Sequence, residues 1–345
     1  MAIRERSKTI QKQILRDVVH HPKDIVSHIS SIFSLSRQAV NRHISQLVKA
    51  GKINATGTTK NRTYTIGSVR SNTLILDISA GASEHDVYFN KFPDILSGLT
   101  QNVEDIVFYG FTEILNNAID HSNGKECFIS VDRTAEKIQI SILDDGEGIF
   151  TKITRACNLA DEKQALLELH KGKLTTDPEN HSGQGIFFTS RMFDEFRIYS
   201  NKLVFTHDHK STHDIIRDAD YVDKKGTLVL MSISLNSKRT DKEVFDEFTV
   251  AAEENDFAFN KTIIPVEMVR FGQENLVSRS QAKRLLLRIE NFKYVYFDFE
   301  NVDTIGQAFA DEIFRVYKLR HPDVLLHHTN ASNDVIKMIK RAEAN

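Results

Sequence analysis

Glu113 and Asn117 are two polar residues whose spacing suits chemistry, because they lie one helical turn apart in the segment FTEILNNAIDHSNG. Apolar residues recur through this segment at intervals of three and four: Phe111, Ile114, Leu115, Ala118 and Ile119. That periodicity predicts a helix with one buried face and with Glu113 and Asn117 on its polar side. There, an amide oxygen can ligate magnesium between phosphates, and a carboxylate can orient or deprotonate a water or a hydroxyl.

A second polar group ends the alternating strand predicted from Lys137, in the sequence KIQISILDDGEGI. Asp144 stands at the end of this strand, where a carboxylate can accept a hydrogen bond from the exocyclic amine of adenine. Gly146 and Gly148 follow it, before Ile149, and they would let the backbone pass close to a base.

A third group consists of glycines placed before an apolar segment. Gly183, Gln184 and Gly185 precede a helix predicted to begin near Ile186. This arrangement suits a phosphate bound by backbone amides at a helix N-terminus. Farther along the chain, Thr227 opens the strand LVLMSIS and offers its hydroxyl to a network that recognises a base.

In this order, the segments resemble the N, G1 and G2 boxes of the GHKL ATPases, the fold shared by DNA gyrase B, MutL, sensor histidine kinases and anti-sigma serine kinases. The resemblance covers about residues 89–235. It implies a Bergerat-type α/β sandwich with a mixed sheet, ATP and Mg²⁺ as cofactors, and an ATP lid over about 150–182. We expect this domain to occupy residues 68–235.

By the same resemblance, Glu113 corresponds to the catalytic base, Asn117 to the magnesium ligand and Asp144 to the adenine-binding aspartate. The other positions implied to contact ATP are Asp120, His121, Gly146, Gly148, Ile149, Ser182, Gly183, Gln184, Gly185, Ile186 and Thr227. His121, at the predicted helix end, is also compatible with a structural role. Gln184 stands where many members carry a longer glycine run, so the resemblance indicates binding more strongly than hydrolysis.

The N-terminal segment, residues 1–67, differs from the rest of the chain in charge. It carries six Lys and six Arg against three acidic residues, a net charge of +9 in a chain whose formal total is -2. This asymmetry favours a polyanionic partner. Periodic apolar residues predict helices over 10–19 and 24–31 and a third helix capped by Ser36, and a basic hairpin follows over 52–66.

This order of elements resembles the winged helix-turn-helix domains of bacterial repressors. Polar side chains on the outer face of the third helix and in the hairpin are of types that bond phosphates and base edges: Arg37, Gln38, Asn41, Arg42, Lys60 and Arg62. We therefore expect residues 1–67 to bind DNA. A winged helix that contacts protein is the alternative.

The C-terminal segment, residues 256–345, follows a charged connector predicted over 236–255. Its patterns alternate between strand and helix: 261–269, 278–289, 294–299, 307–317, 324–328 and 332–342. Such alternation predicts a small α/β domain. The segment resembles a STAS-like domain of unknown function related to anti-sigma antagonists, in which a phosphorylated serine begins one helix. Gly306, Gln307 and Ala308 stand there instead, so we expect an interaction or dimerisation domain.

Composition limits the remaining classes. No apolar stretch approaches the roughly 20 residues that span a bilayer, and the start MAIRERSKTIQKQ is too polar for a secretory signal. We therefore expect a cytoplasmic protein without a membrane partner. Cys127 and Cys157 are the two cysteines, and their spacing supports neither a disulfide framework nor a zinc site.

The patterns together predict a multidomain α/β (α+β) protein that binds ATP and DNA and regulates transcription in bacteria. Its GHKL module would be a nucleotide-dependent switch with weak ATPase activity, and its STAS-like domain would contact a protein partner. Two alternatives stay open. The chain is an anti-sigma-type Ser/Thr protein kinase, or it is an ATP-dependent clamp of the gyrase B/MutL type that forms a homodimer.

Overall fold

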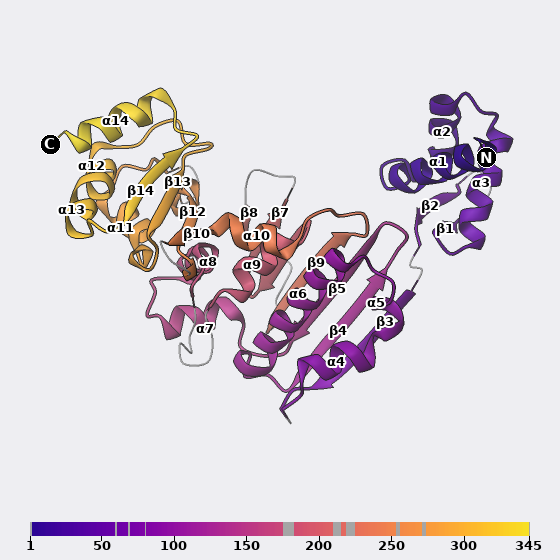
Figure 1. The fold of residues 1–345 in the computed structure, drawn as a ribbon, viewed down its shortest axis with the longest axis horizontal. Coiled ribbons are helices and arrows are strands. Elements are labelled where there is room, and N and C mark those ends of the chain that lie inside the picture. Colours follow the sequence, from indigo (N-terminus) through magenta and orange to yellow (C-terminus); the bar gives the residue numbers. More distant parts are fainter. Residues whose placement is uncertain are drawn as a thin grey trace.

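The computed structural model describes residues 2–58, 61–67, 70–79, 81–174, 183–209, 215–218, 225–252, 256–270 and 274–344. Figure 1 shows an N-terminal helical unit, a central sheet with helices in front of it, and a C-terminal unit at the far end of the molecule from the N-terminus. Two predicted site residues, Lys60 and Ser182, lie outside the described residues.

Three helices and a hairpin make up the N-terminal unit: α1 (Ala2–Asp17), α2 (Ile25–Phe33), α3 (Arg37–Lys49), β1 (Ile53–Thr56) and β2 (Thr63–Ile66). The two strands pair antiparallel. The helices bury a core of their own that includes Ile14, Ile29 and Val40. The predicted cap of α3 is present, because Ser36 Oγ accepts a hydrogen bond from the Ala39 amide at 3.2 Å.

A seven-stranded sheet forms the centre: β3 (Arg70–Asp77), β4 (Glu126–Arg133), β5 (Lys137–Asp144), β6 (Glu195–Ser200), β7 (Leu203–Asp208), β8 (Ile215–Asp218) and β9 (Thr227–Ser234). Its order is β3-β4-β5-β9-β6-β7-β8. The prediction of a mixed sheet is wrong for these strands, since every neighbouring pair is antiparallel. The reason is the position of β9, which separates the mutually parallel strands β5 and β6.

The helices that contact this sheet are α5 (Pro93–Leu96), α6 (Gln101–His121) and α9 (Gly185–Met192). Two more helices, α4 (Glu84–Lys91) and α10 (Asp241–Phe248), pack against α6. The long helix α6 crosses in front of β4 and β5 in Figure 1. Alternate residues of those two strands, including Ile129 and Ile140, are fully buried, as are Ile106 and Phe111 of α6. The apolar face predicted for this helix therefore lies on the sheet.

Two helices follow β5 in the segment predicted to be a lid: α7 (Ile149–Ala156) and α8 (Glu162–Lys171). Gly148 precedes α7 with a φ of 92°, a conformation that favours glycine. Asp161 caps α8 by accepting a hydrogen bond from the Gln164 amide at 2.8 Å. The predicted helix around Leu166 is thus present, and α7 is added to it.

The C-terminal unit has a three-stranded parallel sheet in the order β12-β13-β14. Its elements are β12 (Lys261–Pro265), η1 (Val266–Val269), α11 (Arg279–Leu286), η2 (Ile289–Asn291), β13 (Tyr294–Asp298), α12 (Gln307–Asp311), η3 (Glu312–Tyr317), α13 (Lys318–Arg320), β14 (Leu325–Thr329) and α14 (Asn333–Glu343). The strand predicted over 261–269 ends at Pro265, which lacks the N–H needed to continue the ladder. The helix predicted over 307–317 contains the π-helical turn η3.

The charged connector predicted over 236–255 contains a helix and a strand that the sequence analysis did not assign. It contains α10 and also β10 (Thr249–Ala252), which pairs with β11 (Asp256–Phe259). A capping box begins α10, since Thr240 Oγ1 accepts a hydrogen bond from the Glu243 amide at 3.1 Å. The sequence of this helix, DKEVFDEF, is highly charged, and the helix buries only Val244 and Phe248. Its apolar periodicity is therefore too weak to predict a helix.

The central and C-terminal units share one continuous hydrophobic core, whereas the N-terminal unit has a separate one. Phenylalanines connect the two units: the ring of Phe259 lies 4.7 Å from that of Phe187 in α9 and 5.4 Å from that of Phe292. Among the helices of the described chain, none combines the length and the apolar character needed to cross a bilayer.

Candidate functional site

The Asp144 carboxylate occupies the end of β5 and is 6% exposed. Its Oδ1 accepts hydrogen bonds from the Gly146 amide at 2.9 Å and the Thr227 amide at 3.2 Å. Burial raises the pKa of the Asp144 carboxyl, and these hydrogen bonds act in the opposite direction. The carboxylate is therefore held in one orientation by the backbone.

The ends of β5 and β9 meet so closely that glycine is required between them. A Cβ on Gly226, whose φ is +104°, would overlap the Asp144 carbonyl oxygen. The next residue, Thr227, accepts a hydrogen bond at its Oγ1 from the Ile149 amide at 2.9 Å. The structure thus brings Asp144, Ile149 and Thr227 into one corner, as the sequence predicted.

Glu113 and Asn117 lie on α6 as predicted. Asn117 Nδ2 donates a hydrogen bond to the Glu113 carbonyl oxygen at 2.8 Å. The Glu113 carboxylate is next to the glycine turn, because a Cβ on Gly185 would overlap Glu113 Oε2. The polar face of α6 and the N-terminus of α9 therefore adjoin one another.

A cavity with about 700 Å³ of empty space, including its open mouth, lies among α6, β5, α7, α8, α9 and β9. The predicted site residues that line it are Asn117, His121, Asp144, Gly148, Ile149, Ile186 and Thr227. Its other lining residues are mostly apolar: Ile114, Ala118, Ser122, Ile142, Lys152, Ile153, Leu169, Leu174 and Val229. An apolar chamber with one fixed carboxylate suits a flat heterocycle that carries an amine.

Several predicted positions do not line the cavity: Glu113, Asp120, Gly146, Gly183, Gln184 and Gly185. Asp120 is exposed. Gly146 lies against the Ser122 carbonyl, where a Cβ would overlap it, so this glycine allows a close backbone approach. Gly183 has a φ of +69° and leads into α9, so the glycine turn lies next to the Ile186 wall of the cavity.

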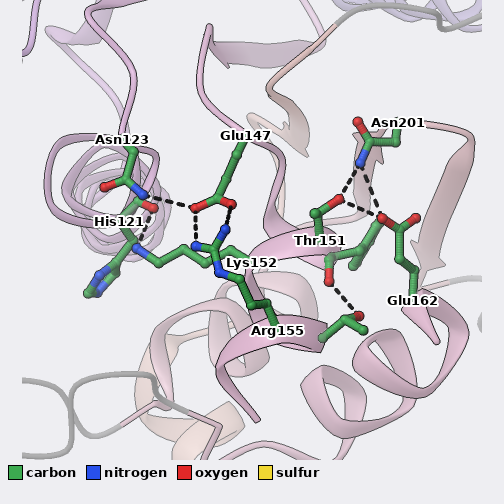
Figure 2. Close-up of polar contacts among 10 residues, drawn as sticks. His121, Asn123, Glu147, Thr151, Lys152, Arg155, Glu162 and Asn201 are labelled. Atoms are coloured by element: carbon green, nitrogen blue, oxygen red, sulfur yellow. Dashed lines mark hydrogen bonds and ion pairs between the residues drawn. The ribbon is translucent and has the colours of Figure 1, made fainter. Parts of the chain in front are cut away.

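Lys152 is a cavity residue that the sequence reasoning missed. Figure 2 shows its side chain reaching from α7 to the end of α6, where Nζ donates a hydrogen bond to the His121 carbonyl oxygen at 2.6 Å. Burial lowers the pKa of the Lys152 ammonium. Its sequence signal is weak, because a lysine between Ile149 and Ile153 points into a cavity only through the packing of α7.

Polar contacts on both sides of α7 fix this helix (Figure 2). At one side, Arg155 Nη1 and Glu147 Oε2 form an ion pair at 2.6 Å. At the other, Thr151 Oγ1 donates to Glu162 Oε1 at 2.5 Å and accepts from Asn201 Nδ2 at 2.5 Å. These contacts join α7 to α8 and to the turn between β6 and β7.

Residues 89–205 match the model of the histidine kinase-like ATPase domain. The matched region of this ATPase domain holds α6, Asp144 and the glycine turn before α9, whereas Thr227 lies beyond it. Residues 281–335 match the model of a STAS-like domain of unknown function. No curated protein matches the sequence.

An ATPase domain of this type implies nucleotide binding, usually with Mg²⁺. The residues around the cavity have the chemistry needed to bind a nucleotide and Mg²⁺. Asp144 is a fixed acceptor at an apolar wall, Asn117 offers an amide oxygen, and Lys152 offers a cation. The Gly183–Gly185 turn lies at the start of α9, where backbone amides can meet phosphate.

The side chains predicted to bind DNA are displayed on the surface of the N-terminal unit. Arg37, Gln38, Asn41 and Arg42 of α3 are exposed, as is Arg62. A groove between α3 and β2 gathers three of them, Arg37, Asn41 and Arg62. DNA binding itself stays a prediction.

In the STAS-like domain, Gly306 caps α12 at the position predicted to replace a phosphoacceptor serine. Its amide donates a hydrogen bond to the Leu276 carbonyl at 2.7 Å, and a Cβ there would come within 2.7 Å of the Val277 backbone. The close backbone approach accounts for glycine at this position.

Proposed function

We propose that this chain is an ATP-binding and DNA-binding regulatory protein in which the ATPase domain acts as a nucleotide-dependent switch. One observation carries the nucleotide part of the proposal. Asp144 places a buried, backbone-bonded carboxylate at the wall of an apolar cavity, next to Thr227. A carboxylate in that position recognises the exocyclic amine of adenine, while the apolar walls cover its faces.

The polar residues around the mouth supply the remaining functions in this proposal. Asn117 would ligate the metal through its amide oxygen, and Lys152 would exchange the His121 carbonyl for a phosphate oxygen. Mg²⁺, when bound, neutralises charge on the phosphates. Glu113, beside Gly185, would orient and deprotonate the attacking hydroxyl.

The acceptor in this proposal is water, and a serine or threonine hydroxyl of a partner protein is the second candidate. The position of Glu113 beside the glycine turn serves both, because a carboxylate deprotonates either kind of hydroxyl. Incubation with γ-labelled ATP and a cell lysate distinguishes them. Free labelled phosphate alone supports hydrolysis, and label on a protein supports the kinase.

Calorimetry with a non-hydrolysable ATP analogue and Mg²⁺ tests the nucleotide site. Asp144→Asn should weaken binding by about tenfold or more, since it removes a hydrogen bond to a charged group and leaves buried partners mismatched. The control is Asp132→Asn, because Asp132 accepts hydrogen bonds from Ser71 and Ser130 and does not line the cavity. Equal affinity in all three proteins would overturn the site.

Electrophoretic shifts with genomic fragments test the DNA part of the proposal. Arg37→Ala should lower affinity by about fivefold or more and reduce the salt dependence, since Arg37 lines the basic groove. The matched control is Arg320→Ala, an exposed arginine of the C-terminal unit. If the wild-type protein shifts no fragment even at low salt, the DNA assignment is wrong.

A further inference from the structure

The helix α8 is largely buried, although it lies at the wall of the candidate nucleotide cavity. Residues Gln164 to Lys171 are all buried, although three of them, Glu168, His170 and Lys171, have charged or histidine side chains. An amphipathic helix on a single surface exposes its polar face. Here the polar face has a second surface to pack against, and that surface is the C-terminal domain.

Hydrogen bonds join α8 to two parts of the C-terminal domain, α11 with the residue that follows it and the strand β12. Gln164 Nε2 donates to the Arg284 carbonyl at 3.1 Å, and Lys171 Nζ donates to the Leu287 carbonyl at 2.7 Å. The Thr262 hydroxyl of β12 donates to the Lys171 carbonyl at 2.9 Å. The end of α8 is therefore fixed both to the segment after α11 and to the first strand of the C-terminal sheet.

A buried ion pair within α8 lies at this contact. Lys171 Nζ lies 2.7 Å from Glu168 Oε1, and each side chain is 1% exposed. Burial lowers the pKa of Lys171 and raises that of Glu168, while their mutual attraction opposes both shifts. Gln164 also donates to Glu168 Oε1, at 2.8 Å, and the same Lys171 ammonium donates to the Leu287 carbonyl, so the charged network of α8 extends to the C-terminal domain.

The same helix is part of the candidate nucleotide site. Leu169, two residues before Lys171, lines the cavity that holds Asp144, and Leu174 lines it just after the helix. Between them, Lys173 Nζ donates a hydrogen bond to the Asn291 carbonyl at 2.7 Å. Along this short stretch, residues that line the cavity therefore alternate with residues that contact the C-terminal domain.

We infer that the function of the C-terminal domain in this protein is to hold α8 and to read out the occupancy of the nucleotide cavity through it. The inference rests on the proposed function of the cavity. A nucleotide that shifts or orders Leu169 moves the helix that carries Gln164 and Lys171, so the segments around 261–270 and 284–293 must respond. The domain is then a sensor of the lid helix and needs no phosphoacceptor.

Hydrogen–deuterium exchange on the full-length protein tests this, with and without Mg²⁺ and the non-hydrolysable ATP analogue. We expect altered exchange at 162–171, 261–270 and 284–293. Exchange should be unchanged at 325–343, which holds β14 and α14, because β13 separates β14 from the strand β12 that contacts α8. Calorimetry on the same sample separates two failures. Absence of binding overturns the proposed function together with the inference, whereas binding without a response at 261–270 and 284–293 overturns the inference alone.

Two variants keep the test independent of folding. Glu168→Met with Lys171→Met replaces the ion pair by apolar side chains of similar length, and Lys173→Ala removes one hydrogen bond at a partly exposed site. Both should retain nucleotide binding, and the response of 284–293 should fall by about fivefold in the double variant and less in Lys173→Ala. Lys242→Ala, on the exposed side of α10, is the control. A full response in both variants would contradict the inference.

Discussion

At the scale of single residues, Asp144 is placed under two opposing requirements. Its burial favours the neutral acid, whereas hydrogen bonds from Gly146 and Thr227 favour the carboxylate. Burial is the larger influence, so the pKa is raised. Asp144, which must be ionised to accept the hydrogen bond from the adenine amine, is therefore protonated at a higher pH than an ordinary aspartate.

We predict that affinity for the ATP analogue falls as the pH decreases through the raised pKa of Asp144. Protonation of the carboxyl removes the acceptor for the adenine amine. The affinity is therefore at its full value above that pKa and falls by about tenfold per pH unit below it. Calorimetry at successive pH values measures the profile. In Asp144→Asn the pH dependence that comes from Asp144 should vanish, and only the titration of the phosphates and other groups should remain. A profile identical to that of the wild type would contradict the role of Asp144 as the adenine acceptor.

Gly185 allows a second prediction at this scale. A Cβ there would meet the flexible end of Glu113, so Gly185→Ala should displace the carboxylate at little cost in stability. Phosphoryl transfer should drop by about 10²-fold, as expected for a lost general base. Turnover in Gly185→Ala, Glu113→Ala and the double variant measures this. Losses that add fully would show that the two residues act separately.

At the scale of elements, α8 shows how a polar sequence is buried. Replacing Lys171 alone by Met leaves Glu168 as an uncompensated buried charge, so we predict a loss of about 3–5 kcal/mol in the free energy of unfolding. The double replacement of Glu168 and Lys171 by Met should be close to neutral. Denaturant unfolding of both proteins measures the difference, and a double variant as unstable as the single one would argue against a simple ion pair.

The same element marks the limit of what the sequence predicted. Asp144 and Thr227 were identified because strand ends and neighbouring glycines have local signals, and the cap at Ser36 followed from its own hydroxyl. The position of Lys152 in the cavity was not predictable, since it depends on how α7 packs. The burial of α8 was missed for the same reason, because EKQALLELHK resembles the sequence of a surface helix.

At the scale of the whole molecule, the number of separate hydrophobic cores, and not the number of domains, determines how many parts unfold independently. The ATPase domain and the C-terminal domain share one core, and the N-terminal unit keeps another. The N-terminal unit touches the rest through Ala135, in the turn between β4 and β5. We therefore expect the chain to unfold as two cooperative units, although it contains three structural units.

We predict two calorimetric unfolding transitions, a small one for residues 1–67 and a large one for the remainder. Saturating ATP analogue with Mg²⁺ should raise the midpoint of the large transition and leave the small one in place, because a ligand stabilises the unit that binds it. At 100 times its Kd the gain is about 2.7 kcal/mol. Three transitions would show that the shared core does not unify the two domains.

The seating of α8 on the C-terminal domain has a consequence for how the protein would behave in a cell. Sensor and sensed element belong to one polypeptide, with Lys171 and Leu287 joined within it. Their encounter is intramolecular, so its equilibrium is governed by an effective concentration and not by the abundance of the protein. Each molecule would report its own nucleotide state with fixed one-to-one stoichiometry, and the response would be insensitive to expression level.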